Sequence, residues 1–285
     1  MSQRRAPTIR VQQVKLNRLH RKLFIFGGLA LLLILCSFFS DQLTPYDPHL
    51  QNLSLAKAPP SSEHLLGTDR YGRDMLSRVI AGSKTSIFST LLLVGFITLF
   101  GSLIGIICAR VGRTIDALLM RTADMFLAFP GLVFALAVAA VLGGGVHNAI
   151  LALAAISWPK YARLARSQTL AIESAPFIQA AKMAGSGPIK IIRKHILPNI
   201  TGPILVTAML DIGTMMMELA GLSFLGLGAK PPIPEWGSMM SDTRNLLPTQ
   251  PWVTLAPGFA IFISVMIFNL LGDTVRDYLD PKNRR

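Results

Sequence analysis

The stretch ESAPFIQAAKMAGSGPIKIIRKHILP, residues 173–198, decides how the rest of the chain is arranged. It is polar and charged, yet it lies between apolar runs that are long enough to cross a lipid bilayer. Because charged side chains are costly to bury in lipid, this stretch must face water. The pattern therefore predicts a membrane protein with a water-exposed segment between two of its spans.

Two short helices are predicted within residues 173–198. Ser174 suits the cap of a first helix whose first turn tolerates Pro176, and Gly185 suits its end. A second helix is predicted over 186–197, stopping near Pro198. Three small residues share a face of the first helix: Ala180, Ala181 and Ala184. Small side chains let another protein approach closely, so the segment is predicted to dock a partner and not to catalyse a reaction.

Residues 173–198 resemble the EAA loop of the membrane subunits of ABC importers, in which Glu-Ala-Ala, Gly and Ile-x-Leu-Pro follow at set spacings. Because of this resemblance we call residues 173–198 the coupling segment. Gln179 stands where that motif has Glu, and His195 stands where it has Ile. In that family the loop is a cytoplasmic helix seated in a groove of the ATPase subunit. The resemblance implies a coupling role for Gln179, Ala180, Ala181, Ala184, Gly185, Leu197 and Pro198.

Composition and charge agree with a membrane protein. Hydrophobic residues make up 51% of the chain and charged residues 15%, with a mean hydropathy of +0.49. The net charge is +13, and 21 of the 28 Lys and Arg residues lie in 1–22, 110–121, 159–199 and the C-terminal tail. The positive-inside rule therefore predicts that both termini and the coupling segment are cytoplasmic. No nucleic acid partner is needed to explain the charge.

The hydropathy pattern predicts an all-α, multi-pass membrane protein with six transmembrane helices. The expected plan is a basic cytoplasmic N-terminus at 1–22, an anchor helix at 23–39, an extracytoplasmic loop at 40–86, a five-helix core at 87–272 and a cytoplasmic tail at 273–285. The core spans are expected at 87–109, 116–142, 149–161, 200–222 and 253–271. Pro130 is expected to kink the second of these.

The extracytoplasmic loop contains HLLGTDRYGRDMLSR, residues 64–78. Residues 75–80 show the spacing of an amphipathic helix lying in the membrane interface. Read alone, the preceding string is a solvated loop whose charged residues Asp69, Arg70, Arg73 and Asp74 pair among themselves. It also resembles a signature of the second permease subunit of peptide and nickel importers. The residues of this outer signature are Gly67, Thr68, Asp69, Gly72, Arg73 and Asp74.

The stretches SFLGLG, PEWG and GDTVRDYLDP also resemble that permease family, so the resemblance covers nearly the whole chain from Asp41 onward. It implies a type I ABC importer permease fold in the bacterial plasma (inner) membrane. The implied partners are a sister permease, two ATP-binding ATPase subunits, an extracytoplasmic solute-binding protein and membrane lipid. ATP and Mg belong to the ATPase subunits, and the chain itself is expected to bind no cofactor or metal.

The solute class is less well determined by the resemblance. DIGTMMMELAG at 211–221 and IFISVMIFNLLGD at 261–273 look more like permeases for nickel or metal chelates than like oligopeptide permeases. A dipeptide or oligopeptide permease of the same family is the alternative. A self-sufficient secondary transporter is the rival from another class, although no internal repeat is seen. GSKTS at 82–86 lacks the glycine and Gly-Lys pair of a P-loop, so this chain encodes no ATP site.

Two acids are predicted within the fifth span. Asp211, Met215 and Glu218 are spaced at i, i+4 and i+7 and share one helix face. A carboxylate within the bilayer costs on the order of 3 kcal/mol, so each acid must face a partner or a watery path. Two interpretations stay open: the face lines a translocation path that favours a cation or an amino group, or each acid pairs with a neighbouring helix.

Overall fold

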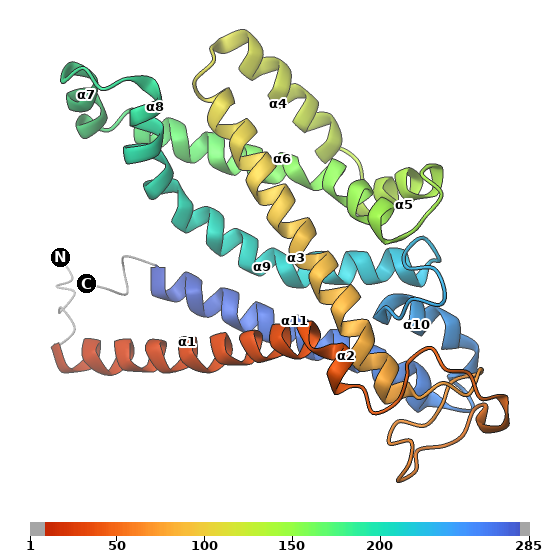
Figure 1. The fold of residues 1–285 in the computed structure, drawn as a ribbon. Helices are drawn as coiled ribbons and strands as arrows, with labels where there is room; N and C mark the ends of the chain where they lie inside the picture. Colours follow the sequence, from red (N-terminus) through yellow and green to blue (C-terminus); the bar gives the residue numbers. More distant parts are fainter. Residues whose placement is uncertain (1–8, 280–285) are drawn as a thin grey trace, which may run out of the picture.

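Each long apolar run of the sequence forms a helix, and the helices assemble into an open, elongated bundle (Figure 1). The structure, a computed structural model, describes residues 9–279. Residues 1–8 of the predicted N-terminus and 280–285 of the predicted tail lie outside this range. Within residues 9–279 the regular elements are all helical, with an isolated bridge between Thr68 and Asp74. The predicted all-α class is confirmed.

The helices in chain order are α1 Ile9–Phe38, α2 Ser40–Leu43, η1 Leu53–Leu55, α3 Met75–Cys108, α4 Arg113–Leu127, α5 Gly131–Val141, α6 Val146–Glu173, α7 Pro176–Met183, α8 Pro188–Ile191, η2 Ile192–Ile196, α9 Leu197–Phe224, α10 Trp236–Thr243, η3 Arg244–Leu246 and α11 Pro251–Leu279. The second of the short η elements, η2, is a π-helical turn.

Four helical segments within residues 9–279 are long and apolar enough to cross a membrane: Asn17–Phe38, Met75–Cys108, Pro188–Phe224 and Pro251–Leu279. The pair α4 and α5 makes a fifth candidate if the two helices are counted as one broken span. The remaining predicted span, 149–161, falls within α6, which continues past it to Glu173 and carries Lys160 near its middle. The sixth span stays a prediction.

Two helices differ from their sequence-based expectation. The predicted interfacial helix at 75–80 is the first part of α3 and is continuous with the span that follows, because Asp74 caps this single helix at its start. The sequence predicts a kink at Pro130, but α4 and α5 are separate helices bent by 92°. A proline lacks the N–H of the helical ladder and also disfavours helical geometry at the residue before it, so the break falls there.

The core has a small cluster that joins Ala123 of α4 to Trp158 and Ala162 of α6, and two large clusters that share α3 and α9. One large cluster joins these helices to α5, α6 and the coupling segment, and the other joins them to α1, α10 and α11. The packing of α3 on α6 is close because Gly101 and Gly105 of α3 lie directly against the α6 backbone. Small residues at such contacts are the usual way for membrane helices to approach one another. The shared helices therefore connect the two halves of the bundle.

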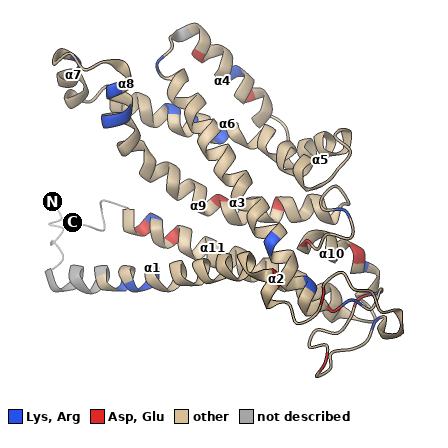
Figure 2. Ribbon diagram, viewed as in Figure 1, with Lys and Arg blue, Asp and Glu red and all other residues tan. Residues whose placement is uncertain are grey.

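The two ends of the bundle differ in character. The start of α1, the end of α11, α7 and α8 lie at one end, and the loop before α3 lies with α10 at the other (Figure 1). Lys and Arg residues mark α8 and the described part of α1 near the first end, whereas long stretches of α1, α9 and α11 carry no charge (Figure 2). This arrangement is compatible with the predicted orientation, in which the α7 end is cytoplasmic.

The orientation gives a first testable prediction. In a background with Cys36 and Cys108 replaced by Ala, a cysteine at Ser61 or Asn245 should react with an impermeant maleimide in intact cells. A cysteine at Lys190 should react only after permeabilisation, because the excess of basic residues places its loop in the cytoplasm. All three positions are exposed, so burial does not bias the comparison. Labelling of position 190 in intact cells would reverse the orientation.

Candidate functional site

The coupling segment forms an arm at one end of the bundle, and its first helix is α7 (Figure 1). The prediction that Ser174 caps this helix is wrong. Ser174 instead ends α6, where its hydroxyl donates to the carbonyl of Ala171 at 2.9 Å, and α7 begins at Pro176 without a side-chain cap. Gly185 follows α7 with a φ of 76°, the left-handed conformation that favours glycine at a helix end.

The second predicted helix of the coupling segment does not stop at Pro198. It begins as α8, passes through η2 and continues directly into α9. Pro198 lies in the first turn of α9, directly after the π-helical turn η2, where the regular α-helical hydrogen-bond ladder is already interrupted. The helices α8, η2 and α9 therefore form one connected rod, so a displacement of the arm can be transmitted to α9.

The two faces of α7 have different surroundings. Ile178 is fully buried (0% exposed) and packs in the same core cluster as Ile191 and Ile196 of the arm. Met183 is 90% exposed, and Phe177 is also exposed. An anchored helix that keeps large apolar side chains in the open is typical of a surface awaiting a partner.

The predicted coupling residues divide between these surroundings. Ala180 and Ala184 are exposed on the side of Phe177, but Ala181 is half-buried, so the three alanines do not form one open face. The exposed side chain of Gln179 turns back on the chain and donates from Nε2 to the carbonyl of Glu173 at 3.3 Å. Gly185, Leu197 and Pro198 are exposed, the last two at the start of α9.

An ion pair holds the base of the arm. Arg110, just beyond the end of α3, donates from Nη1 to Glu173 Oε1 at 2.9 Å, where α6 ends. Both side chains are partly buried, so water and salt screen this pair less than an exposed surface pair. The contact joins α3 to α6 directly beside the start of α7.

The acids of α9 have unequal environments. Asp211 is buried and accepts two hydrogen bonds from α6: one from Lys160 Nζ to Oδ1 at 2.6 Å and one from the Tyr161 hydroxyl to Oδ2 at 2.8 Å. Met215 is also buried, with its sulfur 3.9 Å from the Ser157 hydroxyl. Sequence reasoning missed Lys160 as a partner, although a lysine within an apolar run is itself a signal of an intramembrane site.

Glu218 differs from Asp211 in having no partner. Its side chain is half-buried, and it makes no hydrogen bond or ion pair with any residue of the described part of the chain. The interpretation in which each acid pairs with a neighbouring helix therefore holds for Asp211 within this chain, but no contact of that kind is seen for Glu218. We call Lys160, Tyr161, Asp211 and Glu218 the polar seam.

The outer signature is buried, which contradicts its interpretation as a solvated loop. Asp69 accepts from Arg73 Nε at 2.6 Å and from the backbone N–H groups of Tyr71 and Arg73. Asp74 caps α3 by accepting from Ser77, and it also faces His64 Nδ1 at 2.9 Å. Three charged side chains of the group are nearly inaccessible: Asp69, Arg73 and Asp74. The signature thus holds the outer loop onto the start of α3.

The other predicted members of the outer signature support this fold. Thr68 accepts from the Ala58 N–H at 2.8 Å and donates to the carbonyl of Leu55. Gly67 and Gly72 both adopt positive φ, 67° and 70°. The expected pairing of Arg70 within the string is wrong, because its guanidinium lies 3.6 Å from Asp242 of α10. The loop is therefore tied to α10 as well as to α3.

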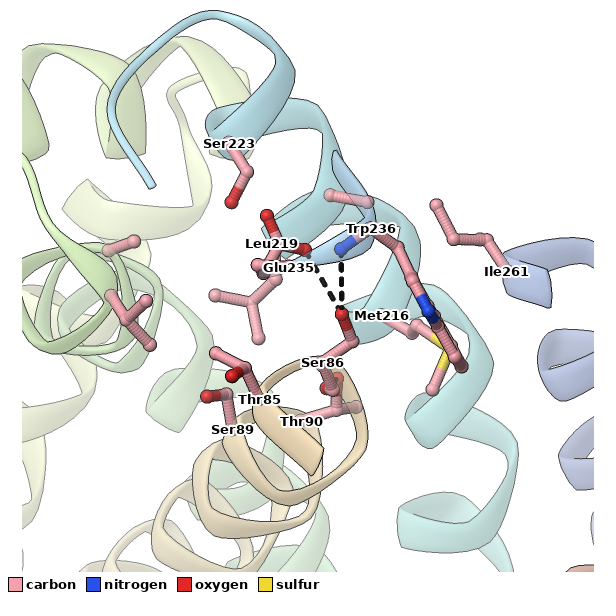
Figure 3. A pocket seen from close by; sticks show the side chains of 13 residues that line it. Thr85, Ser86, Ser89, Thr90, Met216, Leu219, Ser223, Glu235, Trp236 and Ile261 are labelled. Atoms are coloured by element: carbon pink, nitrogen blue, oxygen red, sulfur yellow. Dashed lines mark hydrogen bonds between the residues drawn. The ribbon is translucent and has the colours of Figure 1, made fainter. Parts of the chain in front are cut away.

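A further polar group lies at the same end, between α3, α9 and α10 (Figure 3). The buried Glu235 caps α10 by accepting from the N–H groups of Gly237 and Ser238, and Ser86 of α3 donates to the same carboxylate at 3.2 Å. The cavity beside it measures about 10 Å³, room for about one water molecule. This site is too small for a solute, so Glu235 serves to hold α10 against α3.

The comparisons with known proteins agree on one kind of protein. A family model described as "Binding-protein-dependent transport system inner membrane component" matches residues 101–285. The chain is 43% identical to the dipeptide transport system permease protein of Alkalihalophilus pseudofirmus over 249 residues, which cover 87% of this chain and 82% of that protein. It is 40% identical to the nickel transport system permease protein of Escherichia coli over 250 residues, covering 88% and 90%.

A glutathione transport system permease protein of Pectobacterium atrosepticum is 39% identical over 257 residues, covering 90% of this chain and 85% of that protein. Among solved structures, a chain of the MetNI methionine ABC transporter in an inward-facing conformation matches with a TM-score of 0.57 and 19% identity. That match covers 72% of this chain and 98% of the other, and at this identity it speaks for the fold alone.

Proposed function

Because the chain belongs to the family of binding-protein-dependent transport system inner membrane components, we propose that α7 is the surface through which an ATPase subunit drives solute import. The chain is a permease subunit of an ABC importer with the type I fold, and it is not an enzyme. The observation that carries the proposal is the exposed apolar face of α7 on an arm whose other face is buried.

The connection between the arm and α9 supports a coupling role. A push on α7 is passed to the body of the bundle through Ile178, Ile191 and Ile196, which pack in its core. It is also passed along α8 and η2 into α9, the helix that carries Asp211 and Glu218. Packed helices move as rigid bodies, so closure of an ATPase dimer can reorient α9 without local unfolding.

The partners follow from the family. A permease of this family works with a partner permease, ATPase subunits and a substrate-binding protein. We propose a heteromeric complex with one sister permease and two ATPase subunits, which hold ATP and Mg. It lies in the bacterial inner membrane, with both termini of this chain in the cytoplasm and the binding protein outside. This chain holds no cofactor of its own.

Two solute classes have support. The relative that is a nickel permease and the sequence motifs in α9 and α11 favour nickel or a metal chelate, as the sequence analysis predicted. The dipeptide and glutathione relatives support a short peptide equally well. For either class we propose that the path runs along Asp211, Met215 and Glu218, because acids within the span of a transporter mark its pathway.

Uptake by the reconstituted complex tests this function. Proteoliposomes that contain this chain, its sister permease and the ATPase subunits should accumulate labelled dipeptide or nickel when ATP and the loaded binding protein are supplied. Vesicles without ATP should remain at background, because the chain has no energy source of its own. Uptake by this chain alone, without ATPase subunits, would favour a self-sufficient secondary transporter and contradict the proposal.

A further inference from the structure

The charges of the polar seam do not balance. Lys160 and Asp211 form an ion pair at 2.6 Å that cancels their charges, and both carboxylate oxygens of Asp211 are occupied, one by Lys160 and the other by Tyr161. Glu218 lies two helical turns further on the same face of α9, about 10 Å along the axis. With Glu218 ionised, the seam carries one net negative charge, and Glu218 is the residue that carries it.

This imbalance calls for a positive group from outside the chain. An ionised carboxylate inside a membrane span needs a partner or water, and Glu218 makes no hydrogen bond or ion pair within residues 9–279. The side chain of Lys160 is 53% exposed while that of Asp211 is 8% exposed, so the ion pair lies at the rim of an accessible surface. The seam is therefore open to a group that approaches it.

The chemistry of the seam favours an ammonium group over a bare divalent metal. A divalent ion needs several ligands, but both oxygens of Asp211 already accept a hydrogen bond from α6, and Met215 is buried beside Ser157. No group of three or more His, Cys, Asp or Glu residues in the described part of the chain is arranged to hold a metal. A single carboxylate suits a single ammonium, with which it forms a charge-assisted hydrogen bond.

We propose that Glu218 binds the ammonium group of the transported solute, and that Lys160 is a specificity-determining residue because it cancels the charge of Asp211. This assignment rests on the proposed import function and adds to it the charge class of the solute. Lys160 keeps the seam at one negative charge, so a singly positive group is matched and a doubly positive ion is not. Removal of Lys160 alone would leave two uncompensated acids on the same face.

The first test removes the charge of Glu218 alone. Uptake of dialanine and of N-acetyl-dialanine is measured in the reconstituted complex. Each uptake rate is divided by the fraction of binding protein loaded with that peptide, so that a preference of the binding protein is not counted as a preference of the permease. We expect the wild-type complex to prefer the free amine about tenfold, the effect of roughly one charge-assisted hydrogen bond. Glu218→Gln should lose this preference. Met217→Gln places the same amide on a different, exposed face and should keep it.

The second test restores the balance of charge. Asp211→Asn leaves Lys160 uncompensated and brings the net charge of the seam to zero, so uptake of dialanine should fall about tenfold. Adding Lys160→Met to Asp211→Asn returns the net charge to minus one and should recover most of the uptake. A pair that served only to tie α6 to α9 would show no recovery in the double variant. The amount of assembled complex is measured for each variant.

The outcomes separate the two proposals. If the wild-type complex moves neither dipeptide nor nickel with ATP, the import function itself fails. If it moves dialanine but Glu218→Gln keeps the preference for the free amine, import stands and the role of Glu218 is overturned. The role of Glu218 is also overturned if the wild type moves nickel and no dipeptide. It is overturned as well if Glu218→Gln fails to assemble, which would make Glu218 a residue needed for assembly.

Discussion

Solute uptake is expected to fall to background when Ala180 is replaced by Glu, while the complex still inserts and assembles. Ala180 is exposed on the same side of α7 as Phe177, so a charged side chain there meets the docked ATPase surface and not the core of this chain. Burying an unpaired carboxylate in an apolar interface costs several kcal/mol, enough to abolish a functional contact. ATP-dependent uptake and co-purification of the ATPase subunit are measured together.

A matched variant separates docking from a general effect of charge. Ala171→Glu makes the same change at an exposed position of α6, outside the α7 face, and should transport at close to the wild-type rate. Ile178→Ala would instead weaken the anchoring of the arm, because this side chain is fully buried. If Ala180→Glu transports normally, α7 does not contact the ATPase.

Replacing Gly105 with Val is expected to destabilise the subunit severely. A Cβ at this position would lie 2.2 Å from the carbonyl oxygen of Ala162 and 2.9 Å from the Cβ of Ala165, far inside van der Waals contact. The obstacle is the backbone of α6, so α3 and α6 must separate. Overpacking of this kind costs about 3 kcal/mol or more. Thermal unfolding of the purified complex and the yield of folded subunit measure the loss.

The same helix offers the control. Gly95 of α3 is exposed, and a Cβ added there would meet no other atom within 4 Å, so Gly95→Val should leave the unfolding temperature nearly unchanged. Both variants add the same side chain to the same helix and differ only in what that side chain meets. Equal stability of the two variants would mean that α3 and α6 do not pack as described.

The coupling segment shows which structural features can be predicted from local sequence and which cannot. Its two-helix pattern and the helix end at Gly185 follow from local backbone preferences, which the sequence displays directly. The role of Ser174 and the continuation through Pro198 could not be predicted. Both depend on where the adjoining helices α6 and α9 end and begin, and a serine or a proline is compatible with either side of such a boundary.

The outer signature shows that the burial of charged side chains cannot be predicted from local sequence. Its charged residues look solvated in the sequence, because Asp and Arg are seldom buried. In the structure they are buried, since Asp69 is satisfied by Arg73 and by backbone N–H groups, and Asp74 by the start of α3. Arg70 instead reaches Asp242, a residue far along the chain. Burial of a charge depends on such partners, and these become neighbours only in the folded chain.

The sequence by itself determined the all-α class, the long apolar helices and the permease family, because hydropathy and short motifs are properties of neighbouring residues. Only the tertiary structure decided that Asp211 is paired while Glu218 is not. Lys160 and Asp211 are 51 residues apart in the chain, and the packing of α6 against α9 brings their charges together. No local pattern records that contact, so the unbalanced charge of the seam emerges only when the helices are assembled.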